Sequence, residues 1–506
     1  MTRLSRNVVY NVVGQGLILV VSLIAVRFIF RRLGDDVFGI IFFNLTLTAV
    51  LTRVLELGVS STIVREVSSA YHKEVGYVRE LIRTASLLYW TTGIILVAVI
   101  WITAPLLVTH WINLKTLDPG TAATLLRILS VLSLVALPKG LYTATFRGRQ
   151  MMGINNVIDV GTALAQQMGI LLVLIAGGSV YLVAGWISAS AALGIIAYIV
   201  VASRLFGWGA LAPSFSSYVA RRNFAFTSNM SLTSVASLIN SQASSVIVSK
   251  LLPIGVFGFY GFASSTVNRA TFITGAVAQA AFPSFSNLHR ADNRIALLTQ
   301  YRKLQDLLCY GTVPLFAGVC FAALPVYAYV FNTSVAWLLL IPTAYLSLGT
   351  FMNGTASIPY ILSISVGRPD IGLKTNLWAL VIVLPITVVL ICSFGLAGAG
   401  LSWVAYHVFL YSYQIPRICR DCLHTPTIDW YAHIAKVLAL SALTYGIAWL
   451  VIVVPSGYSL VGCVIGYLVA TIVFGAVALF LIGPDLKSTI RSLPATMRLV
   501  RPAPSR

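Results

Sequence analysis

Four arginines lie inside long apolar runs of the sequence, and three of them, Arg27, Arg53 and Arg269, share spans with other polar side chains that could line a cavity. Charged side chains are costly inside a bilayer and normally face a cavity or another helix. Arg269 is the deepest of the three, too far from either end of its run to reach water easily. Because a guanidinium holds phosphate oxygens through paired hydrogen bonds, and arginine exceeds unpaired acid in these runs, the pattern predicts a cationic cavity for an anion such as phosphate or pyrophosphate.

The other two arginines have simpler alternative explanations. Arg53 precedes Glu56 at i, i+3 spacing, which allows a structural ion pair on one helix. Arg27 is close to the end of its run, where an arginine can anchor a helix at the membrane surface. We therefore expect Arg269 and Arg53 to hold the anion, with Arg27 as the weaker candidate.

Carboxamide side chains occur in the same apolar runs. They are Gln15, Asn44, Asn240, Gln242 and Asn268. Run 224–249 is the most polar of all and is also rich in serine. Close helix packing through small residues is the alternative explanation for the serines, but it does not explain buried amides. We expect the amides to line the same cavity as the arginines.

The composition places these residues in a membrane protein. Of 506 residues 58% are hydrophobic and only 9% charged, whereas a soluble protein carries about 25% charged residues. A soluble enzyme, a disordered chain and a disulfide scaffold are therefore excluded. Runs long enough to cross about 30 Å of hydrocarbon predict an all-α polytopic membrane protein with about fourteen transmembrane helices. The predicted spans are 10–30, 38–57, 85–108, 121–138, 156–176, 181–203, 224–249, 254–282, 304–331, 336–362, 373–393, 396–415, 433–454 and 458–482.

The net charge of +20 is explained by topology. Most of the 34 Lys and Arg residues fall at the two termini and in the loops after even-numbered spans. The positive-inside rule therefore predicts that both termini are cytoplasmic, and no nucleic-acid partner is needed. The loops on the opposite side are too short for a catalytic domain. The long inner loops 58–84 and 283–303 are predicted to be helices on the membrane surface, and the basic tail 484–506 is expected to be attracted to anionic lipid.

An internal repeat divides the chain. Val37-Phe38-Gly39 opens the second span and Val256-Phe257-Gly258 opens the eighth, and the long inner loops superpose at the same separation. Equal orientation of the copies predicts two parallel six-helix lobes related by a pseudo-twofold axis, with two further helices. The expected divisions are an N-terminal lobe 1–210, a C-terminal lobe 211–420, two additional transmembrane helices 421–482 and a basic tail 483–506.

Other motifs indicate little chemistry. Cys419, Cys422 and His424 form a C-x-x-C-x-H pattern, but a zinc site usually needs four ligands. His407 within a span is better explained as a hydrogen-bonded core residue than as a proton relay. No phosphate-binding Walker motif occurs. We expect no metal, no cofactor and no enzymatic activity.

The motifs around the repeat resemble a known family. In the first half they are 33–39 (Leu-Gly-Asp-Asp-Val-Phe-Gly), 55–58 (Leu-Glu-Leu-Gly) and 64–66 (Val-Arg-Glu). In the second half they are 246–250 (Val-Ile-Val-Ser-Lys), 258–263 (Gly-Phe-Tyr-Gly-Phe-Ala) and 282–283 (Phe-Pro). Together they resemble the bacterial polysaccharide flippases, the O-antigen and exopolysaccharide translocases of the multidrug/oligosaccharidyl-lipid/polysaccharide superfamily.

The resemblance implies a flippase that moves a polyprenyl-pyrophosphate-linked oligosaccharide from the cytoplasmic to the outer leaflet of the bacterial inner membrane by alternating access. The related lipid II flippase has essential arginines in spans 1, 2 and 8, which are the spans of Arg27, Arg53 and Arg269. Asn240, Gln242 and Asn268 would bind sugar hydroxyls. Membrane lipids, a polysaccharide polymerase and chain-length proteins are the implied partners.

Two alternatives remain open. A cation-coupled multidrug exporter of the same fold would need acids in its cavity, and where many family members have an acid in span 7 this chain has Ser244-Ser245. A membrane glycosyltransferase or polymerase would need a sizeable loop with catalytic acids or histidines.

The predicted topology is tested by labelling single cysteines from outside sealed right-side-out vesicles. A cysteine at position 178 or 456 should react, because both positions lie in predicted outer loops. A cysteine at 220 or 292 should not. Reaction at 220 would contradict the model with fourteen spans and both termini inside.

Overall fold

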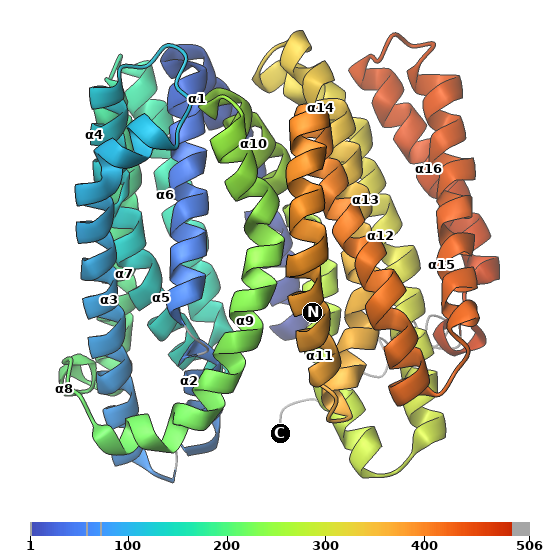
Figure 1. The fold of residues 1–506 in the computed structure, drawn as a ribbon, viewed down its shortest axis with the longest axis horizontal. Coiled ribbons are helices and arrows are strands. Elements are labelled where there is room, and N and C mark those ends of the chain that lie inside the picture. Colours follow the sequence, from blue (N-terminus) through green and yellow to red (C-terminus); the bar gives the residue numbers. More distant parts are fainter. Residues whose placement is uncertain (1–2, 57–58, 71–72, 488–506) are drawn as a thin grey trace, which may run out of the picture. The chain divides into compact units, whose positions relative to one another are not determined.

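The chain folds into long helices that run side by side (Figure 1). The computed structural model describes residues 3–56, 59–70 and 73–487. By its internal contacts the chain forms two compact units, Met1–Phe259 and Tyr260–Arg506. The all-helical class predicted from composition is confirmed, and in the described residues the one piece of β-structure is an isolated bridge between Asn113 and Pro253.

Ten helical segments of the described chain are long and apolar enough to cross a membrane. They are Val20–Thr52, Val75–His110, Pro119–Gly148, Met152–Ile175, Val180–Phe206, Arg294–Val330, Thr333–Ser365, Asp370–Leu423, Thr427–Val453 and Leu460–Leu481. Two of them contain a glycine with non-helical backbone angles, Gly34 in the first and Gly395 in the eighth. These glycines coincide with predicted boundaries between spans. The count of fourteen spans and the expected divisions at 210, 420 and 482 stay predictions.

The first unit is built around α1. Its helices are α1 (Arg3–Glu56), α2 (Val59–Ala70), α3 (Val75–His110), α4 (Pro119–Leu129), α5 (Val131–Gly148), α6 (Met152–Ile175), α7 (Val180–Phe206), α8 (Trp208–Leu211) and α9 (Ser217–Leu251). α6 packs on α1 and α7, α3 packs on α4 and α5, and α9 runs along α1. Buried aromatic and aliphatic side chains such as Tyr89, Phe146 and Tyr198 fill the core.

The second unit is a sequence of long antiparallel helices. α10 (Ile254–Arg269) crosses from the first unit, and α11 (Phe272–Arg290), α12 (Arg294–Val330), α13 (Thr333–Ser365), α14 (Asp370–Ile418), α15 (Thr427–Ser441) and α16 (Leu460–Leu481) follow. α12, α13 and α14 pack in order, and α15 and α16 both pack on α12. Phe321 of α12 contacts the rings of Tyr445, Trp449 and Tyr467 at centroid distances of 5.1–6.1 Å. This aromatic packing joins α16 and the helical turns 442–453 after α15 to the second unit.

Two predicted spans are interrupted in the structure. Predicted span 121–138 is divided at Ser130, whose hydroxyl donates to the Arg127 carbonyl at 2.6 Å. Predicted span 254–282 is divided after Arg269, where the amide and hydroxyl of Thr271 both donate to the Asn268 carbonyl. Serine and threonine hydroxyls that bond to nearby carbonyls compete with the helical ladder. The hydrophobic runs gave no sign of either interruption, because apolar residues continue on both sides.

Both loops predicted to form surface helices are helical in the structure, but only one of them contains a separate helix. Loop 58–84 contains a separate helix, α2, followed by the start of α3. Loop 283–303 contains no separate helix, because its residues are shared between the end of α11 and the start of α12. Within the tail, residues 488–506 lie outside the described part of the chain.

Candidate functional site

Arg269, the deepest predicted cation, ends helix α10 at the interruption of the predicted span. Its side chain is exposed, and it forms no ion pair with any described residue. The neighbouring Asn268 is also exposed, and its amide nitrogen lies 3.5 Å from the Ser264 hydroxyl. A cation at the C-terminal end of a helix is favoured by the partial negative charge there. Helix α10 itself contains no acid that could pair with Arg269.

Helix α11 begins three residues later and brings backbone donors to the same place. The first amide groups of a helix have no partner within the helix and attract anions. Here α11 begins at Phe272 after Thr271, and no side chain caps it. An arginine and a helix N-terminus within three residues of each other form a chemical arrangement suited to phosphate oxygens.

The six other predicted residues belong to the first unit and have different surroundings. Asn44 is fully buried, and its amide nitrogen donates to the Leu129 carbonyl at 3.1 Å, so it joins α1 to the end of α4. Asn240 is buried with 8% exposed surface, whereas Gln242 and Arg27 are half-buried. The side chains of Gln15 and Arg53 lie outside the described residues. Whether any of these residues binds substrate stays a prediction.

Asp36, which lies between two predicted spans, connects a bend in α1 to a distant loop. Gly34 adopts φ 82° and ψ 178°, a backbone conformation open to glycine, and turns the chain there. Two residues later, Asp36 is buried and its Oδ2 accepts the backbone amides of Lys115, Thr116 and Leu117 at 2.7–3.0 Å. The loop between α3 and α4 is thereby fixed to the bend.

The same loop is also fixed to the turn between α9 and α10. The Asn113 carbonyl accepts the Ile254 amide at 2.9 Å, and its side-chain amide donates to the Lys250 carbonyl at 2.8 Å. The Trp111 indole donates to the Ser249 hydroxyl at 3.1 Å. We call residues 111–117 the clasp, because they connect the bend of α1 with the turn 249–254.

Beneath the clasp the backbones of α1 and α10 touch. A Cβ on Gly39 would overlap the Ile254 carbonyl, and a Cβ on Gly258 would lie 2.8 Å from the Cα of Gly39. The two repeated tripeptides therefore meet at their glycines. Only glycine allows this approach, which gives the repeated motif a physical reason.

A second polar cluster ties the other end of α9 to α2 and α3. Glu66 is buried with 7% exposed surface and accepts a hydrogen bond from Tyr77 at 3.0 Å. Asn223 of α9 donates to the Tyr77 hydroxyl at 2.9 Å, and Arg222 lies 4.0 Å above the Tyr77 ring. A hydrogen bond with Glu74 raises the pKa of Arg222 further above its ordinary value, so its charge is retained. Both ends of α9 are thus fixed within the first unit.

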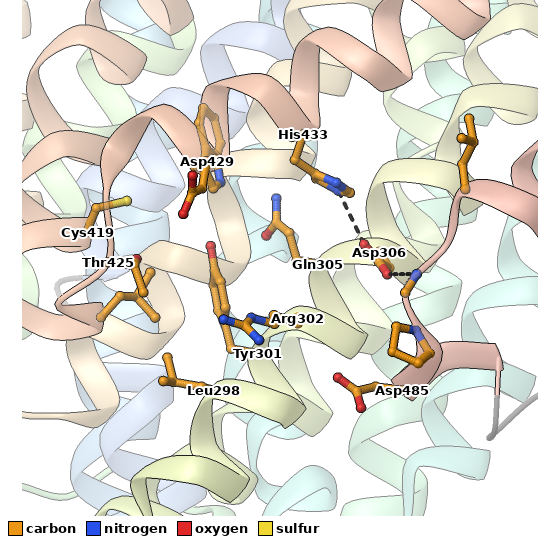
Figure 2. Close-up of a pocket in the computed structure, with 15 residues that line it drawn as sticks. Leu298, Tyr301, Arg302, Gln305, Asp306, Cys419, Thr425, Asp429, His433 and Asp485 are labelled. Carbon is orange, nitrogen blue, oxygen red and sulfur yellow. Dashed lines mark hydrogen bonds and ion pairs between the residues drawn. The ribbon is translucent and has the colours of Figure 1, made fainter.

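The sequence offered partial signals for these residues. Asp36 and Glu66 both fall within the quoted family motifs, but composition could not tell which contacts they make. The motifs do not include Asp306, whose carboxylate accepts the Gly483 amide at 2.8 Å and lies 3.4 Å from His433 (Figure 2). In the described part of the chain, no group of three His, Cys, Asp or Glu residues could hold a metal ion.

A family model decides the relationship of this chain to known proteins. The model described as polysaccharide biosynthesis protein matches residues 28–341, more than half of the sequence. The chain belongs to this family. A putative O-antigen transporter of Shigella flexneri is 20% identical over 422 residues, which cover 82% of this chain and 98% of the transporter. The resemblance inferred from the motifs is confirmed.

Solved structures of two transport proteins have a fold similar to that of this chain. The lipid II flippase MurJ in an inward closed conformation has a TM-score of 0.69 and 13% identity, covering 97% of this chain and 100% of the flippase. An inward-facing multidrug resistance MATE family transporter has a TM-score of 0.61 and 13% identity, covering 83% of this chain and 95% of the transporter. The relatives are transporters and flippases, not enzymes.

Removal of the Asp36 carboxylate should release the clasp. Asp36→Ala leaves the amides of Lys115, Thr116 and Leu117 without their acceptor. Since a hydrogen bond to a charged group contributes about 1.5–3 kcal/mol, amide exchange at these residues should accelerate by about tenfold or more. Hydrogen–deuterium exchange with mass spectrometry on the peptide containing 111–117 measures the change.

The neighbouring acid supplies the matched control. Asp35 is exposed, and among the described contacts it makes no hydrogen bond to the clasp, so Asp35→Ala should leave exchange unchanged. Equal exchange in wild type and Asp36→Ala would show that the clasp is held by other contacts.

Proposed function

We propose that this protein translocates a polyprenyl-pyrophosphate-linked oligosaccharide across the membrane, from the cytoplasmic to the outer leaflet. The observation that carries the proposal is Arg269, an exposed arginine at a helix interruption in an apolar segment, with no ion-pair partner among the described residues. A cation in such surroundings is expensive unless it serves a ligand. The family description and the similarity to an O-antigen transporter support a glycan-bearing anion as that ligand.

The chemistry of the head group sets what the protein must supply. A pyrophosphate and several sugars lose their hydration on entering the membrane, which is prohibitive unless polar groups replace the water. Arg269 and the first amides of α11 would bind phosphate oxygens, with Arg53 and Arg27 as further cations. Asn268 and the amides of α9 would bind sugar hydroxyls. The polyprenyl chain would remain in the lipid while the head group crosses.

Alternating access gives the clasp and the glycine contact a role. In the predicted topology both lie at the outer end of the spans, where the closed state must exclude the substrate. Glycine backbones in contact close the passage there, and the clasp holds them together. In the outward-open state, the tripeptides 37–39 and 256–258 would separate.

A cation-coupled multidrug exporter remains the second candidate, because a MATE family transporter shares the fold. It would bind cationic or apolar solutes, for which an arginine without a counter-ion is unfavourable. The two candidates thus make opposite demands on Arg269.

Arg269→Ala is expected to reduce glycan export by at least tenfold, because charge-assisted hydrogen bonds to phosphate contribute about 1.5–3 kcal/mol each. Arg269→Lys should restore only part of the activity, since an ammonium lacks the planar pair of donors. Export is measured in cells lacking the chromosomal copy, with the amount of protein in the membrane quantified in parallel.

Arg290→Ala, an exposed arginine at the other end of α11, is the matched control and should export normally. Full export by Arg269→Ala would remove Arg269 from the mechanism. Loss of drug resistance without loss of glycan export would favour the multidrug exporter.

A disulfide across the glycine contact tests alternating access. Val37→Cys and Val256→Cys, in a chain whose native cysteines are replaced by serine, should cross-link in the closed state and stop export. Reduction should restore export, and neither single cysteine should respond to oxidant. Normal export by the cross-linked protein would show that the chain does not open there.

A further inference from the structure

An apolar groove on the first unit adjoins a polar cup. The groove has a volume of about 340 Å³ and lies between α2, α3 and the start of α9, which are together at the lower left of Figure 1. The cup has a volume of about 500 Å³ and lies where α3 meets residues 214–218. Phe215 lines both, so they are neighbouring parts of one surface. None of the residues assigned to the transported substrate lines either part.

The lining residues of α3 change from charged to apolar along this surface. Glu80 and Arg83 line the cup, and residues 84, 87, 88 and 91 line the groove. Steps of three or four residues keep them on one face of the helix. At 1.5 Å per residue, positions 80 and 91 are separated by about 16 Å along the helix. Predicted span 85–108 begins at this change, so the cup lies at the membrane border and the groove leads inward.

The groove offers a hydrocarbon surface. Leu81 is buried at its wall, whereas Leu88 and Phe224 have 43% and 72% exposed surface. The amide of Asn223, which also lines the groove, already donates to the Tyr77 hydroxyl at 2.9 Å. An occupant of the groove would therefore gain mainly from apolar contact, as an acyl chain does.

The cup is held in shape by its own hydrogen bonds. The backbone amide of Ser214 donates to the Arg83 carbonyl at 3.2 Å, and that of Ser216 donates to the Thr84 hydroxyl at 3.2 Å. The Ser216 hydroxyl donates to the Glu80 carboxylate at 2.9 Å. Residues 214–216 are thus fixed against α3, and the two charged side chains are presented on a preformed wall.

Glu80 and Arg83 give the cup one charge of each sign. Neither forms an ion pair with another described residue. The nearby Arg222 is engaged, because it pairs with Glu74 at 2.9 Å. A carboxylate and a guanidinium side by side suit a ligand that carries a cation and an anion close together.

We propose that this surface binds one molecule of phosphatidylethanolamine from the leaflet predicted to be cytoplasmic. The ammonium would donate to Glu80, the phosphate would accept from Arg83, and one acyl chain would lie in the groove. A zwitterionic head group matches both charges, whereas an anionic head group would leave Glu80 without a partner. The lipid would connect α2, α3 and the start of α9.

Lipid titration of the full-length, delipidated protein in native mass spectrometry tests the head-group preference. The first phosphatidylethanolamine should bind at least about fivefold more tightly than phosphatidylglycerol with the same acyl chains, because only the former offers a charged donor to Glu80. Glu80→Gln should abolish this preference. Arg83→Gln should weaken both lipids by about fivefold or more, since both carry a phosphate.

Two exposed charges outside the surface supply matched controls. Arg79→Gln removes the neighbouring cation of α3, and Asp292→Asn removes an acid of the second unit on the same predicted side. Both variants should keep the wild-type affinities. Thermal unfolding without lipid, measured for every variant, shows that the folded state is retained.

A photoreactive acyl chain locates the bound lipid. Phosphatidylethanolamine with a diazirine in one chain should cross-link to peptides containing 84–91 and 219–224. Ala220→Trp places an indole in the groove and should reduce this product, as should Glu80→Gln.

The remaining outcomes contradict the proposal. Equal affinities for the two lipids in the wild type, or an unchanged preference in Glu80→Gln, would mean that the cup does not recognise the amine. Tighter binding of phosphatidylglycerol or of a polyprenyl phosphate would assign the surface to an anionic lipid. Cross-links confined to other helices would place the acyl chain outside the groove.

Discussion

Scarcity of carboxylates governs how this chain is held together. It has 14 Asp and Glu residues against 34 Lys and Arg residues, and an acid that is wholly or partly removed from water needs partners. Asp36 accepts three backbone amides, and Glu66 accepts from Tyr77 and lies near Arg222. Asp159 bonds to Tyr198 and Lys139, and Asp306 to Gly483 and His433. Each of these four acids connects separate segments and acts as a structural tie, and no ion pair joins Arg269 to an acid among the described residues.

Interruptions of helices determine where function can reside. A continuous helix satisfies its own backbone and has nothing to offer a polar solute inside a membrane. At Gly34 the chain bends, and the bend is where Asp36 holds the clasp. At Ala270 and Thr271 the chain leaves one helix and enters another, and this interruption is where Arg269 adjoins the first amides of α11. Both positions combine a freed backbone with a charged side chain, as in other transporters with broken helices.

The sequence by itself determined the membrane class, the helical fold, the family and the glycines at which spans end. Hydrophobic runs and charge asymmetry report directly on the solvent around each segment, and the motifs 33–39 and 258–263 identify the family. It also indicated Arg269 as the deep cation. Tertiary structure alone decided that the Asn44 amide donates to the Leu129 carbonyl, that Gly39 meets Gly258, and that Asp36 holds a loop about eighty residues away. Such contacts join residues distant in sequence, and periodicity carries information only about neighbours along one element.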